Sequence, residues 1–66
     1  MVKNFNGQRL RQARLYNGLS INDLAEILGV TKQAISQYET QNVTPEFEKM
    51  RILTEKLNIF IIFFYY

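Results

Sequence analysis

Four polar side chains without a carboxylate among them gather near the middle of the chain: Lys32, Gln33, Ser36 and Gln37. In a helix these positions share one face, because residues three and four apart are neighbours on a helix surface. Glutamine can form two hydrogen bonds with N6 and N7 of adenine, serine can reach several bases or phosphates, and lysine can contact guanine or phosphate. The alternative is a helix face that contacts only solvent. The residues before Lys32 decide between a face that contacts bases and a solvated face.

That preceding segment predicts a tight corner between two helices. Ser20 is a good N-cap with Asp23 three residues on, a shortened capping box, and Thr31 is the N-cap of the next helix. Only residues 29–31 separate the two helices, and a joint this short forces a large crossing angle, as in a helix-turn-helix. The pattern therefore predicts a helix-turn-helix over residues 20–40.

The packing positions around this corner are specific. Ala25 has to be small because the second helix crosses close to it, and Gly29 has to allow a positive φ in the turn. Ile35 and Tyr38 have to fill the space between the helices. These constraints turn Lys32, Gln33, Ser36 and Gln37 outward and favour a helix over residues 32–40 that reads bases in the DNA major groove. An ordinary helical hairpin without a ligand is the alternative.

A second group of residues is placed to hold the DNA backbone. If the helix over residues 32–40 enters the groove, the N-terminus of the preceding helix faces the phosphates, where free N–H groups bind anions. Capping and ordinary surface charge are the alternative roles of these residues. The predicted phosphate contacts are Ser20, Asn22, Arg9, Arg11 and Thr31.

The composition excludes several classes of site. The 66 residues include neither cysteine nor histidine, which removes disulfides, zinc-finger spacing and the usual nucleophile–base pairs. Ser20 and Ser36 have helix roles and no histidine base, so we expect no enzyme, catalytic residue, metal or cofactor. No apolar run reaches the roughly 20 residues that span a membrane, and no signal peptide is visible at the N-terminus. These features favour a cytoplasmic protein.

The helix signals predict an all-α fold, a single domain over residues 1–66 with four short helices and an apolar tail that can be a short fifth helix, a buried extended segment or an edge strand. The first helix starts after Asn6, and the fourth opens at Thr44-Pro45, an N-cap followed by proline. Apolar residues three and four apart predict the core face of the fourth helix: Phe47, Met50, Leu53 and Leu57. The apolar tail over residues 59–66 has no clear period. It can complete the core, form a dimer contact, or be the junction with a further domain.

The net charge of +2 is too small to indicate a nucleic acid by itself. Its distribution is uneven, because residues 1–38 carry +3 and residues 39–66 carry −1. A polyanion should therefore meet the first part of the chain.

The chain resembles the phage repressor and Cro-like helix-turn-helix family, often called the XRE family. The resemblance covers residues 6–60 and needs no gap. It rests on Arg9-Leu10-Arg11-Gln12-Ala13-Arg14, Gly18-Leu19-Ser20, Asp23-Leu24-Ala25-Glu26, Leu28-Gly29-Val30-Thr31, Ala34-Ile35-Ser36-Gln37-Tyr38-Glu39, Pro45 and Leu57.

The resemblance implies a compact, lambda-repressor-like bundle of about five short helices that binds double-stranded DNA. It implies base contacts by Gln33 and Gln37, a base or phosphate contact by Lys32, and a phosphate contact by Ser20. It also implies an ion pair between Arg14 and Glu39, a structural role that agrees with the position of Arg14 beside an apolar stripe.

The chain departs from the family pattern at two positions, and it also resembles a narrower group of proteins. Ile21 stands where the family often has glutamine, and it can pack on a thymine methyl, a partner protein or a second subunit. No glycine follows Glu39, so Asn42 is the candidate for a left-handed residue. Three segments also look like the domain in front of an ImmA/IrrE-type metallopeptidase: Phe5-Asn6-Gly7, Gln33-Ala34-Ile35-Ser36-Gln37-Tyr38-Glu39 and Phe63-Phe64-Tyr65. A C-terminal domain beyond this chain would follow from that resemblance.

Two functions remain open from the sequence. The leading one is sequence-specific binding of double-stranded DNA by a transcriptional regulator, a repressor that acts as a homodimer. The second is a protein-interaction module or antitoxin in which DNA binding is secondary, because Ile21 and the aromatic tail add apolar surface.

Overall fold

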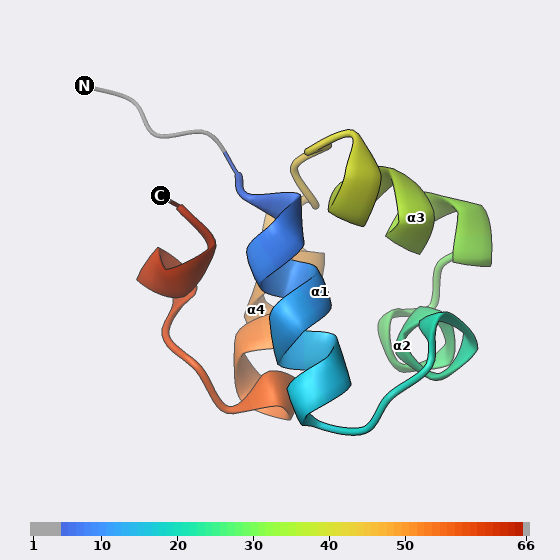
Figure 1. Ribbon diagram of the computed structural model, residues 1–66, viewed down its shortest axis with the longest axis horizontal. Coiled ribbons are helices and arrows are strands. Elements are labelled where there is room, and N and C mark those ends of the chain that lie inside the picture. The colour runs from blue at the N-terminus through green and yellow to red at the C-terminus, as the bar shows by residue number, and fades with distance from the viewer. Residues whose placement is uncertain (1–4, 66) are drawn as a thin grey trace.

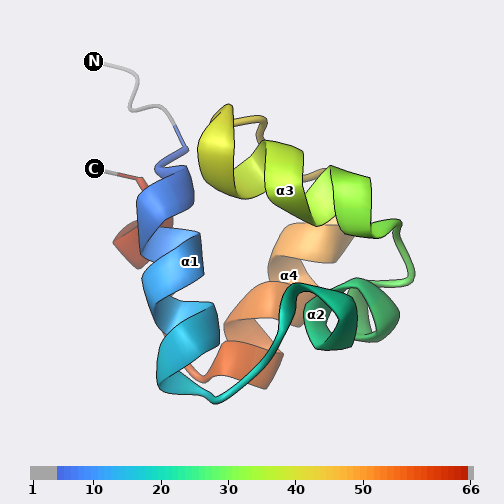
Figure 2. The same cartoon turned by 45° about the vertical axis from the view of Figure 1, so that its right-hand side comes forward.

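Helices make up most of the described chain. The computed structural model describes residues 5–65, which form α1 (Gly7–Tyr16), α2 (Ile21–Leu28), α3 (Lys32–Thr40), α4 (Phe47–Leu57) and the 3-10 helix η1 (Ile61–Phe64) (Figure 1). In Figures 1 and 2, α1 has α3 on one side and η1 on the other. The predicted all-α fold of about five short helices is confirmed, because residues 5–65 form four α-helices and the short 3-10 helix η1.

Local capping sets the ends of these helices. The Asn6 side chain accepts hydrogen bonds from the backbone N–H groups of Gln8 and Arg9, so α1 begins where the sequence predicts. Gly18 after α1 and Asn58 after α4 have φ of 70° and 57°, the left-handed conformation that stops a helix. These ends were predictable because each depends on residues a few positions apart.

The start of α4 differs from the prediction. The helix begins at Phe47, not at Thr44-Pro45, and its N-cap Glu46 makes no side-chain hydrogen bond to the helix. Pro45 lies in the extended segment before the helix, with its ring buried. Phe47 was predicted to face the core, but its side chain is 73% exposed. Because a helical Cα–Cβ bond tilts toward the N-terminus, Phe47 in the first turn projects beyond the end of the core.

The core combines one face of every helix. Met50, Leu53 and Leu57 of α4 are buried as predicted. They belong to a cluster that also includes Leu10 of α1 and Leu24 of α2, among other apolar side chains. Burial of these side chains is the main favourable contribution to folding.

Both ends of the described chain meet at this core. Phe5 and Phe64 are buried with ring centroids 5.6 Å apart, and Phe5 forms an isolated antiparallel bridge with Tyr65. The Asn6 N–H donates to the Phe64 carbonyl oxygen at 2.6 Å. The first of the three roles expected for the tail, completion of the core, is therefore confirmed for Phe64. Within residues 5–65, no helix is long and apolar enough to cross a membrane.

Candidate nucleic-acid interface

The corner between α2 and α3 has the predicted geometry. Gly29 ends α2 with φ 71° and ψ 34°, and the Val30 N–H donates to the Ala25 carbonyl oxygen at 3.0 Å. The Thr31 hydroxyl oxygen then accepts from the Ala34 N–H at 3.1 Å and caps α3. Figure 1 shows α2 nearly end-on while α3 lies across the page, so the two helices cross steeply. Ala25 is buried at this crossing, as the sequence predicts.

The two faces of α3 differ in chemistry. Ile35, Tyr38 and Glu39 are buried on its inner face. Lys32 and Gln33 are exposed at the start of the helix, and Ser36 and Gln37 are half-buried one turn later. Glu39 is the one carboxylate of α3, so its burial leaves an outer face with a cation, amides and a hydroxyl. Such a face suits a polyanion that also carries hydrogen-bonding base edges.

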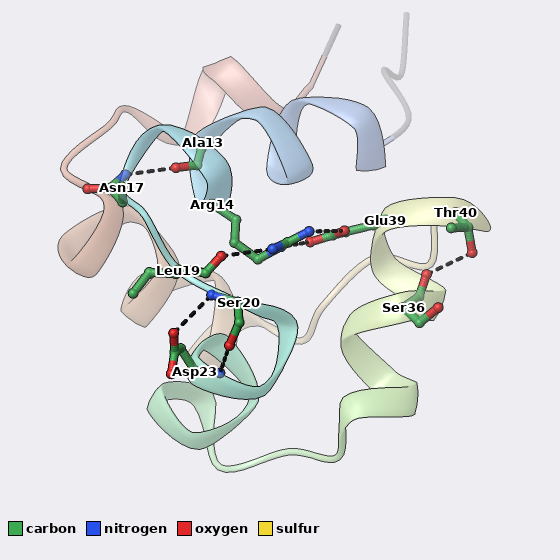
Figure 3. Close-up of polar contacts among 9 residues, drawn as sticks. All are labelled: Ala13, Arg14, Asn17, Leu19, Ser20, Asp23, Ser36, Glu39 and Thr40. Carbon is green, nitrogen blue, oxygen red and sulfur yellow. Dashed lines mark hydrogen bonds and ion pairs between the residues drawn. The ribbon is translucent and has the colours of Figure 1, made fainter.

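The N-cap residues of α2 and α3 both carry hydroxyl groups, Ser20 and Thr31. The Ser20 oxygen accepts from the Asp23 N–H at 2.9 Å, and the Asp23 carboxylate accepts from the Ser20 N–H at 2.9 Å, which completes the capping box (Figure 3). A hydroxyl that accepts a hydrogen bond can still donate its own proton. Ser20 and Thr31 can therefore cap a helix and donate to a phosphate. Asn22 lies exposed in the first turn of α2.

The capping box makes α2 sensitive to acid. The Ser20 N–H and, to a smaller degree, the Ser20 hydroxyl hold the pKa of the Asp23 carboxyl below its usual 3.8. The stabilisation from ionised Asp23 is therefore complete above pH 3.8 and is lost as the pH falls through the lowered pKa. We expect the difference in melting temperature between the wild type and Asp23→Ala to be largest at neutral pH and to vanish in strong acid.

Thermal unfolding followed by circular dichroism across this pH range measures that difference. Asn22→Ala is the control, because it removes a neutral neighbour that is also exposed in the first turn of α2. Its difference from the wild type should stay constant with pH. An Asp23→Ala difference that is equally constant would contradict the role assigned to the carboxylate.

The two arginines predicted to contact phosphates lie on different faces of α1. Arg11 is exposed and lines a surface hollow of about 530 Å³ together with Glu39 and Thr40, at the C-terminal end of α3. The Arg9 guanidinium carbon lies 4.9 Å from the ring centroid of Phe63, and its Nη1 donates to the Phe63 carbonyl oxygen at 3.4 Å. The structure thus places Arg11 beside α3 and Arg9 beside the tail. It does not bring Arg9 together with the other predicted contacts.

Arg14 and Glu39 form the predicted ion pair between α1 and α3 (Figure 3). Arg14 Nε and Nη2 donate to the two Glu39 carboxylate oxygens at 2.6 and 3.2 Å, and Nη1 donates to the Leu19 carbonyl oxygen at 2.8 Å. Both residues are buried. The pair therefore fixes the C-terminal half of α3 against α1 and holds its inner face toward the core.

A close contact between backbones adds to this support, and the sequence analysis missed it. Gly7 is buried at the start of α1, and a Cβ added there would meet the carbonyl oxygens of Tyr38 and Glu39. The Gly7 N–H donates to Asn42 Oδ1 at 2.8 Å. Asn42 has φ 55°, the left-handed conformation expected for it. The glycine in Asn6-Gly7 was a signal for such close approach.

The structure also shows where Ile21 lies and whether acidic side chains gather as metal ligands. Ile21 is half-buried and packs against the core cluster, which none of its three proposed roles included. Among the described residues, no group of three or more acidic, cysteine or histidine side chains could hold a metal ion.

Comparisons with known proteins agree with this geometry. The sequence profile of a helix-turn-helix family matches residues 10–59. A protein of Methanocaldococcus jannaschii that is named as an HTH-type transcriptional regulatory protein is 36% identical over 53 residues, 80% of this chain and 17% of its own length. A protein of Methanospirillum hungatei with the same name is 44% identical over 36 residues, 54% of this chain and 12% of its own length. The chain thus spans less than a fifth of these relatives.

Solved structures resemble this chain over most of its length. The restriction-modification controller protein C.AhdI from Aeromonas hydrophila superposes with a TM-score of 0.76 at 27% identity, covering 89% of both chains. The biofilm regulator SinR, solved in complex with DNA, superposes with a TM-score of 0.73 at 30% identity, covering 85% of this chain and 90% of SinR. The N-terminal DNA-binding domain of SinR from Bacillus subtilis gives the same TM-score and identity.

Proposed function

The chain belongs to the Cro-like (XRE) helix-turn-helix family, and from this premise we propose that it is the sequence-reading DNA-binding domain of a transcriptional regulator. The observation that carries the proposal is the outer face of α3. Lys32, Gln33, Ser36 and Gln37 project from a helix held steeply across α2, and the one carboxylate of α3 is turned inward. An α-helix in this setting fits the major groove of B-DNA.

The proposed contacts divide into base readers and backbone contacts. Gln33 and Gln37 read adenine through its N6 and N7 atoms, and Lys32 and Ser36 contact neighbouring bases. Phosphate contacts fix the register of the helix in the groove. The proposed phosphate contacts are Ser20, Asn22, Thr31 and Arg11. Arg9 packs on Phe63, which favours a structural role for this arginine.

In vitro selection of bound duplexes from a random pool tests this proposal. We expect enrichment of a sequence with two symmetric half-sites about one helical turn apart, because the proposed form on DNA is a homodimer. Binding should weaken steeply as salt is added, because phosphate contacts release counterions. Absence of enrichment at low salt would overturn the proposal.

Substitutions at the glutamines test which helix reads the sequence. We expect Gln33→Ala and Gln37→Ala each to lower discrimination at one or two base pairs by about 1–3 kcal/mol, with the fold retained. Competition binding against duplexes with single base changes measures this loss. Gln12→Ala is the matched control, an exposed glutamine on α1. If both α3 variants keep the selectivity of the wild type, α3 is not the reader.

A protein-interaction module or antitoxin is the second candidate function. The exposed apolar side chains of the tail favour it, because Phe60 and Ile62 are largely in solvent. No gel shift at low salt, together with a tight protein partner in a pull-down, would favour this reading. A further domain beyond this chain, including one of the ImmA/IrrE type, also stays a prediction.

A further inference from the structure

Two asparagines of this chain precede a glycine, Asn6 at the start of α1 and Asn17 at its end. In such a pair the backbone nitrogen of the glycine can attack the side-chain amide of the asparagine, because glycine has no side chain to hinder the approach. The other asparagines precede larger residues. The two pairs have the same local chemistry, so the structure around each one decides how readily it reacts.

The Asn17-Gly18 peptide lies in an open turn between α1 and α2. Both residues are exposed, and a Cβ added at Gly18 would meet no atom within 4 Å. The ψ of Asn17 is 4°, which directs the Gly18 nitrogen away from the side-chain amide, so the peptide must turn before the two can react. This movement breaks the bond from the Gly18 N–H to the Leu15 carbonyl oxygen, 2.9 Å long. Exposed helix ends open in this way at little cost in free energy.

The Asn6-Gly7 peptide is held in place by the rest of the fold. Gly7 is buried, and its N–H donates to Asn42 Oδ1 at 2.8 Å. The Asn6 side chain accepts from the backbone N–H groups of Gln8 and Arg9. Attack on the Asn6 amide would therefore have to undo the first turn of α1 and its contact with the loop after α3. Opening of a buried segment of this kind costs far more free energy than opening of an exposed turn.

We propose that Asn17 is a site of spontaneous deamidation in the folded protein and that Asn6 is protected. The Gly18 nitrogen bonds to Asn17 Cγ, the Cγ–Nδ2 bond breaks, and the proton of the Gly18 nitrogen leaves with Nδ2 as ammonia. Water then opens the resulting cyclic imide, giving its hydroxyl to one of the two ring carbonyl carbons and its other hydrogen to the Gly18 nitrogen. Opening at Cγ gives aspartate. Opening at the backbone carbonyl carbon gives isoaspartate, in which the main chain runs through the former side chain.

The reaction removes a contact that ties together the ends of two helices. Asn17 Nδ2 donates to the Ala13 carbonyl oxygen at 2.8 Å (Figure 3) and, over a longer 3.5 Å, to the Leu57 carbonyl oxygen at the end of α4. A carboxylate only accepts hydrogen bonds, so both carbonyl oxygens lose this donor. The new negative charge also lies at the negative end of the α1 dipole. Deamidation should therefore loosen α1 from α4 and raise the unfolded fraction, which shortens the lifetime of a protein in the cell.

Peptide mapping by mass spectrometry tests the proposal on the full chain incubated in mild alkali. In the folded protein we expect Asn17 to convert at least about tenfold faster than Asn6, because the buried site opens only with wider unfolding. In urea the two rates should become equal, since the residue pairs are the same. Asn17→Gln is the control, because its longer side chain closes a ring far more slowly. Equal rates at Asn6 and Asn17 in the folded protein, or conversion of Asn17 in urea alone, would overturn the proposal.

Thermal unfolding of Asn17→Asp tests the consequence for stability. We expect a melting temperature about 4–8 °C below that of the wild type, from the lost donor and the unfavourable charge. Asn6→Asp is the matched control, and it should stay within about 2 °C of the wild type because asparagine and aspartate cap helices about equally well. Incubation in mild alkali should lower the melting temperature of the wild type and leave that of Asn17→Gln unchanged. An Asn17→Asp variant as stable as the wild type would contradict the role assigned to the Asn17 amide.

Discussion

Arg14→Ala is expected to destabilise the domain by about 3–5 kcal/mol, the usual cost of leaving one partner of a buried ion pair alone. The substitution removes two buried hydrogen bonds to the Glu39 carboxylate and a partly buried one to the Leu19 carbonyl oxygen. A domain of this size has a total stability of roughly 3–10 kcal/mol. The loss is therefore a large share of the total, and Glu39→Ala should come close to it. Thermal or urea unfolding measures both.

The double variant Arg14→Met with Glu39→Leu separates pairing from packing. It removes both charges and fills the space with apolar side chains, so it should regain most of the stability lost by either alanine variant. A remaining loss of about 1 kcal/mol is expected, because the Leu19 carbonyl oxygen loses its donor. If the double variant is no more stable than Arg14→Ala, the unpaired buried charge is not the cause of the loss.

Arg51→Ala is the control for an ion pair in solvent. Arg51 contacts Glu48 and Glu55 on α4, but its side chain is about half exposed. Exposed pairs contribute about 0–1 kcal/mol. A loss at Arg51 as large as that at Arg14 would show that burial does not decide the effect. We expect the double variant Arg14→Met with Glu39→Leu to keep the DNA selectivity of the wild type, because Arg14 is buried against Glu39 and is not among the proposed DNA contacts.

The features of this fold that were predictable from the sequence are those that depend on neighbouring residues. Ser20 and Thr31 each cap a helix by bonding to an N–H three residues later, so their residue types and spacing were sufficient. The outward face of α3 followed from its helical period, since burying Ile35 and Tyr38 directs Lys32 and Gln33 to the other side. The candidate site on α3 and its corner could therefore be placed without coordinates.

The features that escaped prediction depend on residues far apart in the chain. The direction of Arg9 is set by Phe63, 54 positions away, and nothing in the residues around Arg9 indicates this. The tail has no helical or strand period because its structure follows from the bridge between Phe5 and Tyr65. Phe47 fits the helical period of α4, but the helix begins too late for this side chain to reach the core.

The contact between Gly7 and the end of α3 also joins residues far apart in the chain, and it leads to the second prediction with a large effect. We expect Gly7→Ala to destabilise the domain by about 3 kcal/mol or more. The new Cβ would lie 2.5 Å from the Glu39 carbonyl oxygen and against that of Tyr38. Both are backbone atoms that cannot rotate away, so α1 and α3 must separate. Overpacking of this kind costs about 1–3 kcal/mol, and separation also strains the bond from Gly7 to Asn42.

Gly18→Ala is the matched control, and the comparison isolates the clash. Gly18 has φ 70°, but a Cβ added there meets nothing within 4 Å. Its expected cost is the conformational penalty alone, about 1–2 kcal/mol. In a domain of this size each kcal/mol shifts the melting temperature by about 4–8 °C, so the two variants are easily distinguished. Equal shifts would mean that α1 and α3 can separate freely at Gly7. Because the same contact positions the end of α3, Gly7→Ala should also weaken DNA binding under conditions where it remains folded.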